Sequence, residues 1–178
     1  MKGGPQTWDE FKEEPVDVVR ACISLDGTRI AAVFNGGILC IYDTTTGEAI
    51  LTPIKVDEDP QTVVFSRDGK LVASGGQTLR LWNVQTGEEV ESFNIGVDSL
   101  AFSPDGTCIA AGCEPCDGRA IRGGDNYNLR VINLELANTS AHVIPSEGRT
   151  LLKGEVPPSP FEGHVDDVIS VAYSPDGK

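Results

Sequence analysis

Three closely spaced cysteines are the first residues whose types and spacing suggest chemistry. Cys113 and Cys116 form a Cys-x-x-Cys pair, and Cys108 lies shortly before it. Structural zinc needs four ligands, usually as two such pairs, and no second pair follows. A redox pair is expected within a β-α-β unit, which the pattern does not predict. We therefore interpret residues 113–116 as a loop between two strands and expect neither metal nor cofactor.

His164 is the second candidate, because histidine is the most frequent general base in enzymes. The chain has only two histidines, and no Ser-His-Asp arrangement is suggested by spacing. No Gly-rich loop ends in Gly-Lys-Ser/Thr, so nucleotide binding has no support. His164 follows Gly163 and precedes a predicted strand, which favours a structural hydrogen-bonding role. We expect no catalytic residues and predict that the chain is not an enzyme.

Charge and composition exclude several classes of partner. The 178 residues include 14 Lys and Arg against 27 Asp and Glu, which gives a net charge of -13. A nucleic-acid interface or an anionic lipid surface needs a basic patch, so neither is expected. No apolar run approaches the length of a membrane span, and residues 1–15 contain no apolar core of a secretory signal. These observations predict a cytoplasmic or nuclear protein without a disulfide framework.

The elements that must position these residues repeat along the chain. Four segments share a Ser-x-Asp-Gly turn between two apolar runs, and their aspartates are 42, 37 and 71 residues apart. The four aspartates are Asp26, Asp68, Asp105 and Asp176. Each full unit continues with a third apolar run and a more polar fourth, and a Thr-Gly-Glu turn separates these two runs in the first two units. Four short strands for each unit of about 40 residues predict an all-β repeat fold.

The pattern resembles the WD-repeat (Trp-Asp repeat) β-propeller family. The resemblance rests on Gly163-His164, on the Ser-Pro-Asp-Gly turns and on the ends of the third strands. Those ends are Tyr42-Asp43, Trp82-Asn83 and Ile132-Asn133. It implies a partial β-propeller of four-stranded antiparallel blades over residues 16–178. Residues 1–15 are expected to form an N-terminal segment with a short helix.

The expected units are 16–57, 58–95, 96–160 and an incomplete 161–178, which would supply the first strand of a fourth blade. The third unit carries a Ser-, Thr- and Pro-rich connector at 136–160, which we interpret as mobile. Within it, Ser159-Pro160 is a candidate site of proline-directed phosphorylation. Since each blade packs only against its neighbours, we expect further blades from the rest of the chain or from another chain.

The chain departs from the family at a hydrogen-bond network that often ties each blade together. Its Asp position, six residues before Tyr42, Trp82 and Ile132, holds Gly36, Gly76 and Asn126. We therefore expect the blades to depend on apolar packing more than on this network.

Acidic residues recur at one position of the repeat. Seven residues before the turn serine lie Asp17, Asp59 and Asp167, with Gly96 in the third unit, and Asp98 follows two residues after Gly96. The resemblance places this position at the rim of the central channel. We predict that this acidic rim binds a basic peptide or protein segment, because complementary charge selects partners.

The resemblance implies a non-catalytic protein-interaction scaffold, a WD-repeat module of a larger regulatory or signalling protein. The family includes subunits of signalling and transcriptional complexes and sensor regions of NTPase-containing receptors. Two alternatives remain open: a fragment without independent function, and an enzyme with a site at the channel mouth.

Overall fold

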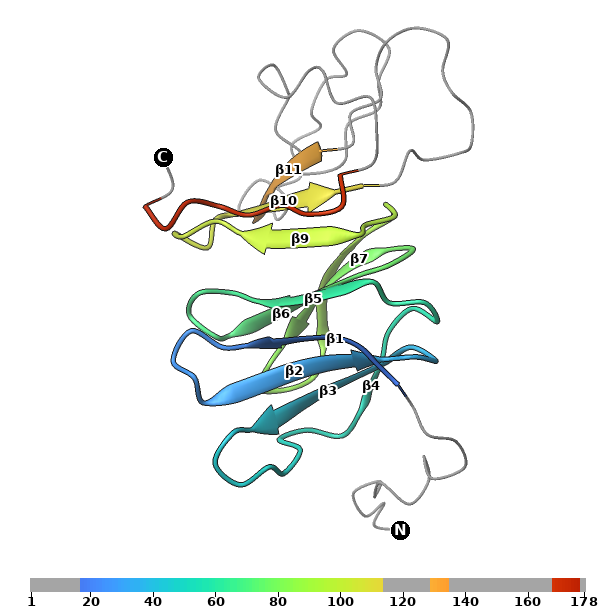
Figure 1. Cartoon of the computed structure of the whole chain (residues 1–178), viewed down its shortest axis with the longest axis vertical. Helices are drawn as coiled ribbons and strands as arrows, with labels where there is room; N and C mark the ends of the chain where they lie inside the picture. The colour runs from blue at the N-terminus through green and yellow to red at the C-terminus, as the bar shows by residue number, and fades with distance from the viewer. Residues whose placement is uncertain (1–16, 114–128, 135–167, 177–178) are drawn as a thin grey trace, which may run out of the picture.

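The strands of the protein form three antiparallel sheets stacked along its long axis (Figure 1). The computed structural model describes residues 17–113, 129–134 and 168–176. The first sheet contains β1 (Val18–Ile23), β2 (Arg29–Phe34), β3 (Ile38–Asp43) and β4 (Ile54–Lys55). The second contains β5 (Thr62–Phe65), β6 (Leu71–Gly75), β7 (Leu79–Asn83) and β8 (Glu89–Phe93). The third contains β9 (Ser99–Phe102), β10 (Cys108–Gly112) and β11 (Leu129–Asn133). The all-β prediction is confirmed.

Each sheet is a meander in which strands adjacent in sequence pair with each other. The innermost strands of the three sheets, β1, β5 and β9, lie next to one another. Alternation of side chains along each strand gives every sheet two apolar faces. Among the described residues, none forms a helix long and apolar enough to cross a bilayer.

Two apolar clusters hold the three sheets together. Between the first and second sheets, Val33, Leu39 and Ile41 are buried together with Val72 and Trp82. Between the second and third sheets, a second cluster holds Leu79, Leu81, Leu100, Ile109 and Ile132. The middle sheet therefore packs on both faces.

The Ser-x-Asp-Gly turns have the geometry that the sequence predicts. In the first turn the Ser24 hydroxyl donates to Asp26 Oδ1 at 2.6 Å, and the Thr28 amide donates to the same oxygen at 3.0 Å. Gly27 has a φ of 71°, a conformation that favours glycine. The turns at Ser66 and Ser103 repeat the serine–aspartate bond at 2.7 Å and 2.6 Å. These turns fix the register between the first two strands of each sheet.

The fourth strand of the first sheet is much shorter than the more polar fourth run of the first unit, residues 48–56, which the repeat pattern predicts to be a strand. Only Ile54–Lys55 pairs with β3, and a single bridge joins Tyr42 to Ala49. Pro53 immediately before β4 has no N–H to donate, which limits extension of the ladder in that direction. In the second sheet, the equivalent strand β8 is five residues long and forms four residue pairs with β7.

Residues 168–176, where the first strand of a fourth blade was predicted, lie against the third sheet without strand pairing. The Val171 amide donates to Ser99 Oγ at 2.7 Å. The predicted N-terminal helix, the connector at 136–160 with Ser159, and both His164 and Asp167 lie outside the described residues. The predicted unit boundaries stay a prediction.

Candidate interaction surface

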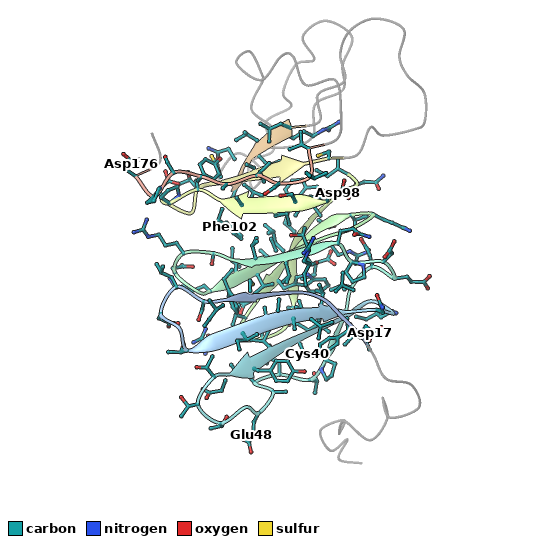
Figure 2. The ribbon with its side chains drawn as sticks, in the orientation of Figure 1. Asp17, Cys40, Glu48, Asp98, Phe102 and Asp176 are labelled. Atoms are coloured by element: carbon teal, nitrogen blue, oxygen red, sulfur yellow. The ribbon has the colours of Figure 1, made fainter. Side chains whose placement is uncertain are left out.

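The described members of the acidic rim precede the innermost strands. Asp17 comes directly before β1, Asp59 lies shortly before β5, and Asp98 comes directly before β9. Asp17 and Asp59 are exposed, and Asp98 is half-buried. Figure 2 shows Asp17 and Asp98 toward one edge of the molecule and Asp176, in a turn, at the opposite edge. The innermost strands thus carry carboxylates where they begin and turns where they end.

The side chains of Asp17 and Asp59 have no hydrogen bond or ion pair with any described residue. Main-chain hydrogen bonds hold Asp17 and Asp98 in place. The Asp17 carbonyl accepts the Asn35 amide at 3.0 Å, and the Asp98 amide donates to the Gly112 carbonyl at 2.9 Å. Both partners lie at the end of a second strand, so the rim adjoins the hairpins between second and third strands.

A polar network that the sequence analysis missed lies beside the rim. Asp57 Oδ2 accepts hydrogen bonds from the Thr78 amide at 2.7 Å and the Thr78 hydroxyl at 2.6 Å. Arg80 contacts Asp57 Oδ1 at 3.2 Å and Glu89 Oε2 at 3.0 Å. Asp57 belongs to the linker between the first two sheets, so its carboxylate ties that linker to the β6–β7 hairpin.

The linker also approaches two glycine-containing hairpins closely. A Cβ on Gly37 would collide with the carbonyl oxygen of Asp57, and a Cβ on Gly76 would lie 2.6 Å from that of Asp59. Gly76 occupies the position at which the family often has an aspartate. Here the carboxylate that binds the hairpin comes from the linker instead, at Asp57.

The cysteines form no metal site in the part of the chain that the structure describes. Cys113 is buried and lies 3.6 Å from the Ala111 carbonyl, and Cys108 is half-buried. No group of three or more His, Cys, Asp or Glu residues is placed to hold a metal in residues 17–113, 129–134 and 168–176. Cys116 lies outside these ranges.

Turn carboxylates carry lowered pKa values at the end of the strands opposite the rim. Hydrogen bonds from the Ser24 hydroxyl and the Thr28 amide lower the pKa of Asp26 to about 2. Bonds from Ser103 and Thr107 lower the pKa of Asp105 to about 2 in the same way. These carboxylates are committed to the turns, whereas Asp17 and Asp59 have no side-chain partner among the residues that the structure describes.

Comparison with known proteins confirms the resemblance. Residues 88–121 match the family described as "WD domain, G-beta repeat". The chain is 30% identical over 113 residues to apoptotic protease-activating factor 1 of Rattus norvegicus, covering 57% of this chain and 9% of that protein. It is 34% identical over 95 residues to eukaryotic translation initiation factor 3 subunit I of Aspergillus fumigatus, covering 48% of this chain and 26% of that protein. It is 25% identical over 174 residues to WD repeat-containing protein SL1-17 of Schistosoma mansoni, covering 95% of this chain and 48% of that protein.

A solved structure shows the same fold. The β-propeller domain of Myceliophteria thermophila Cps50 (Swd1) superposes with a TM-score of 0.52 at 17% identity, covering 66% of this chain and 40% of that chain. The partial β-propeller predicted from the sequence is therefore confirmed. The chain spans about half the length of the schistosome protein, and less of the other two relatives.

Proposed function

We propose that this WD-repeat segment is a non-catalytic protein-interaction module of a larger regulatory or signalling protein, acting in the cytoplasm or nucleus. The observation that carries the proposal is the pair Asp17 and Asp59. Both are exposed carboxylates at the same position of successive repeats, and neither is paired within the described residues. WD-repeat propellers generally bind proteins and generally lack catalytic activity, which supports this class of function.

The partner that best suits the acidic rim is a basic peptide or protein segment. Like charges held at one end of the innermost strands create a negative potential, which attracts Lys and Arg side chains. Asp98 extends the rim onto the third blade, and Asp167 would extend it further. Such complementarity raises the association rate and selects the partner more than it adds to affinity.

Further blades are the second class of partner. The first blade exposes apolar side chains on β1, with Val18 56% and Ile23 60% exposed. The equivalent strands β5 and β9, each preceded by another blade, begin with two buried residues. Because a propeller blade buries its faces only against neighbours, we propose that blades from the rest of the protein or from another chain cover this face.

The test of the rim uses a fluorescein-labelled peptide rich in Lys and Arg, with binding followed by fluorescence anisotropy at low and high salt. We expect Asp17→Lys with Asp59→Lys to abolish binding, and Asp167→Lys to add to the effect. The matched control is Glu48→Lys with Glu88→Lys, which changes the net charge equally at exposed residues of the turns that follow β3 and β7. Equal loss in both double variants would show a general charge effect and reject the rim.

The same variants are then compared in a pull-down from cell extract. We expect the rim variants to lose specific proteins that the control variants retain. An unchanged set of bound proteins, with the variants still folded, would remove the support for the rim as a binding surface.

A further inference from the structure

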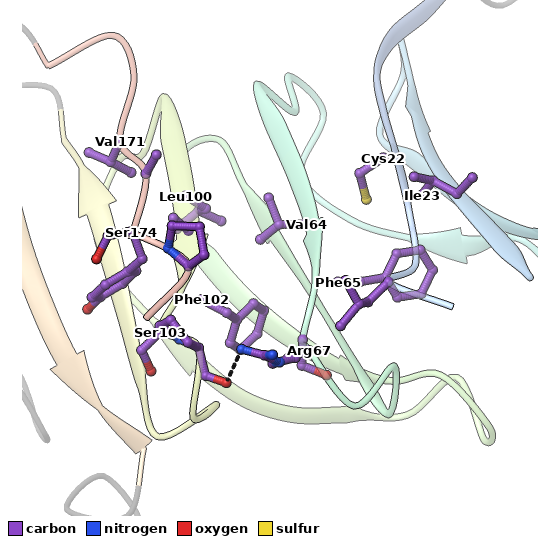
Figure 3. Close-up of a pocket in the computed structure, with 17 residues that line it drawn as sticks. Cys22, Ile23, Val64, Phe65, Arg67, Leu100, Phe102, Ser103, Val171 and Ser174 are labelled. Carbon is purple, nitrogen blue, oxygen red and sulfur yellow. Dashed lines mark hydrogen bonds between the residues drawn. The ribbon is translucent and has the colours of Figure 1, made fainter. Parts of the chain in front are cut away.

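A cavity of about 490 Å³ lies at the end of the innermost strands opposite the acidic rim (Figure 3). Four chain segments contribute to it: the ends of β1, β5 and β9 and residues 171–175. The residue directly before each turn serine lines it, and three of the four are aromatic. These residues are Ile23, Phe65, Phe102 and Tyr173. The repeat therefore builds a largely apolar wall by placing the same position side by side four times.

The surroundings of the cavity disfavour charge. Burial raises the pKa of the Cys22 thiol to about 11, and burial likewise raises the pKa of the Tyr173 hydroxyl. Leu25, which also lines the cavity, is 71% exposed. A large apolar side chain is thus left in water at a hollow that an apolar group could fill.

Among the described residues that line this cavity, Arg67 is the one with a charged side chain. Its Nη1 donates to the Pro104 carbonyl at 3.3 Å, and no carboxylate in the described residues pairs with it. The nearby turn carboxylates are occupied: Asp68 accepts from the Ser66 hydroxyl and the Lys70 amide, and Asp105 accepts from the Ser103 hydroxyl and the Thr107 amide. The guanidinium therefore keeps donors available beside an apolar wall.

We propose that this cavity binds an extended peptide in which an apolar side chain is followed by a carboxylate. The apolar side chain packs against Phe65 and Phe102, and the carboxylate accepts hydrogen bonds from Arg67. An arginine fork suits a carboxylate because two parallel N–H donors match its two oxygens. This site goes beyond the acidic rim, since it lies at the other end of the strands and selects the opposite charge.

The probe is a fluorescein-labelled peptide, Gly-Ser-Leu-Phe-Asp-Glu, titrated with the full 178-residue chain and followed by anisotropy. We expect saturable binding that weakens about tenfold or more when Asn and Gln replace the two acidic residues, as expected for a charge-assisted hydrogen bond. Replacement of Leu and Phe by Ser is expected to abolish binding. A peptide that binds equally well in its amide form would overturn the proposal.

Two substitutions on the protein make the test specific. Arg67→Gln is expected to weaken the acidic peptide about tenfold and to leave the amide peptide unchanged. The matched control is Lys70→Gln, which removes an exposed cation outside the cavity lining and is expected to leave binding within a factor of about two. Leu25→Ser, at a largely exposed side chain, is expected to weaken both peptides. Equal effects of Arg67→Gln and Lys70→Gln would reject the site.

A charge swap keeps the proposal testable even if affinity is low. Arg67→Glu is expected to lose the acidic peptide and to gain binding of Gly-Ser-Leu-Phe-Lys-Lys. Absence of that gain in a variant that melts like the wild type would count against Arg67 as the recognition residue. Decanoate is the competing ligand: displacement of the peptide by decanoate at equal concentration would assign the cavity to a fatty acid instead. Neither result depends on the rim, because Asp17 and Asp59 are unchanged.

Discussion

The indole nitrogen Nε1 of Trp82 donates a hydrogen bond to Ser74 Oγ across 2.9 Å, from β7 to the neighbouring β6. Both residues are buried. The equivalent positions of Ser74 in the other two sheets hold Ala32 and Ala111, which offer no side-chain acceptor. Among the three described sheets, this indole–serine bond is therefore present in the middle sheet alone, where Asp57 also binds the β6–β7 hairpin.

We expect Ser74→Ala to lower the free energy of unfolding by about 1–3 kcal/mol, because it leaves a buried indole N–H without an acceptor. Adding Trp82→Phe removes that unpaired donor, so the double variant should lose less than the sum of the two single variants. Denaturant unfolding of the wild type, the two single variants and the double variant measures the coupling free energy between Ser74 and Trp82. Ser92→Ala, at an exposed serine on β8, is the control. Strict additivity would mean that the bond contributes nothing.

Two adjacent glycines allow the cost of backbone strain to be compared with the cost of a steric collision. Gly36 and Gly37 have φ of +84° and +76°, so alanine at either costs about 1–2 kcal/mol of strain. A Cβ on Gly36 meets nothing, whereas one on Gly37 collides with the Asp57 carbonyl. We expect Gly37→Ala to lower the melting temperature clearly more than Gly36→Ala. Equal melting temperatures would show that the linker moves away at no cost.

Asp26 gives a prediction about pH. Hydrogen bonds from the Ser24 hydroxyl and the Thr28 amide lower the pKa of Asp26 from 3.8 to about 2 in the folded chain. A lowered folded-state pKa means that its stabilisation is complete above pH 4 and is lost as the pH falls toward 2. The melting temperature of Asp26→Asn should therefore lie below that of the wild type at pH 7, and the difference should shrink between pH 4 and 2. A difference that grows in that range would contradict the turn as its cause.

Asp57 and Glu89 both contact Arg80, and we expect their substitution to lower stability by different amounts. Asp57 is 12% exposed and accepts two hydrogen bonds from Thr78, so Asp57→Ala should cost about 1–3 kcal/mol. Glu89 is 36% exposed, and its one side-chain partner among the described residues is Arg80. Glu89→Ala should therefore lower the free energy of unfolding by less than about 1 kcal/mol. Denaturant midpoints compare the two. A larger loss at Glu89 would mean that the ion pair, and not the hairpin bond, carries the stability.

The turns were the most predictable part of the structure. Ser24, Asp26 and Gly27 act within a few residues of one another, so their hydrogen bonds and positive φ can be inferred from local sequence. The strands that each turn joins, such as Arg29–Phe34, followed from the same repeats. The Thr-Gly-Glu turn was equally local: Asp43 Oδ1 accepts the Thr45 and Thr46 amides, and Gly47 has a φ of 73°.

Interactions between blades were not predictable in the same way. Asp57 and Thr78 are 21 positions apart in the sequence. The sequence signal for their hydrogen bond would have been an aspartate in the linker combined with Gly76 at the hairpin position where the family often has an aspartate. The shortness of β4 was also missed, because the fourth run of the repeat, residues 48–56, was expected to form a full strand despite Pro53. The cavity at Arg67 depends on four segments together, and only their repetition hinted that these positions would be neighbours.

The meander order of the strands has a consequence for synthesis on the ribosome. Within each sheet, strands that are consecutive in sequence pair with each other. The ties between sheets, such as Arg29 to the Gly69 carbonyl and Arg67 to the Pro104 carbonyl, reach forward by about one repeat. At roughly 5–20 residues per second, a repeat of about 40 residues emerges in roughly 2–8 s, far longer than a hairpin needs to form. Each blade can therefore fold as it leaves the exit tunnel and present a finished apolar face to the next, which makes nascent-chain assembly directional.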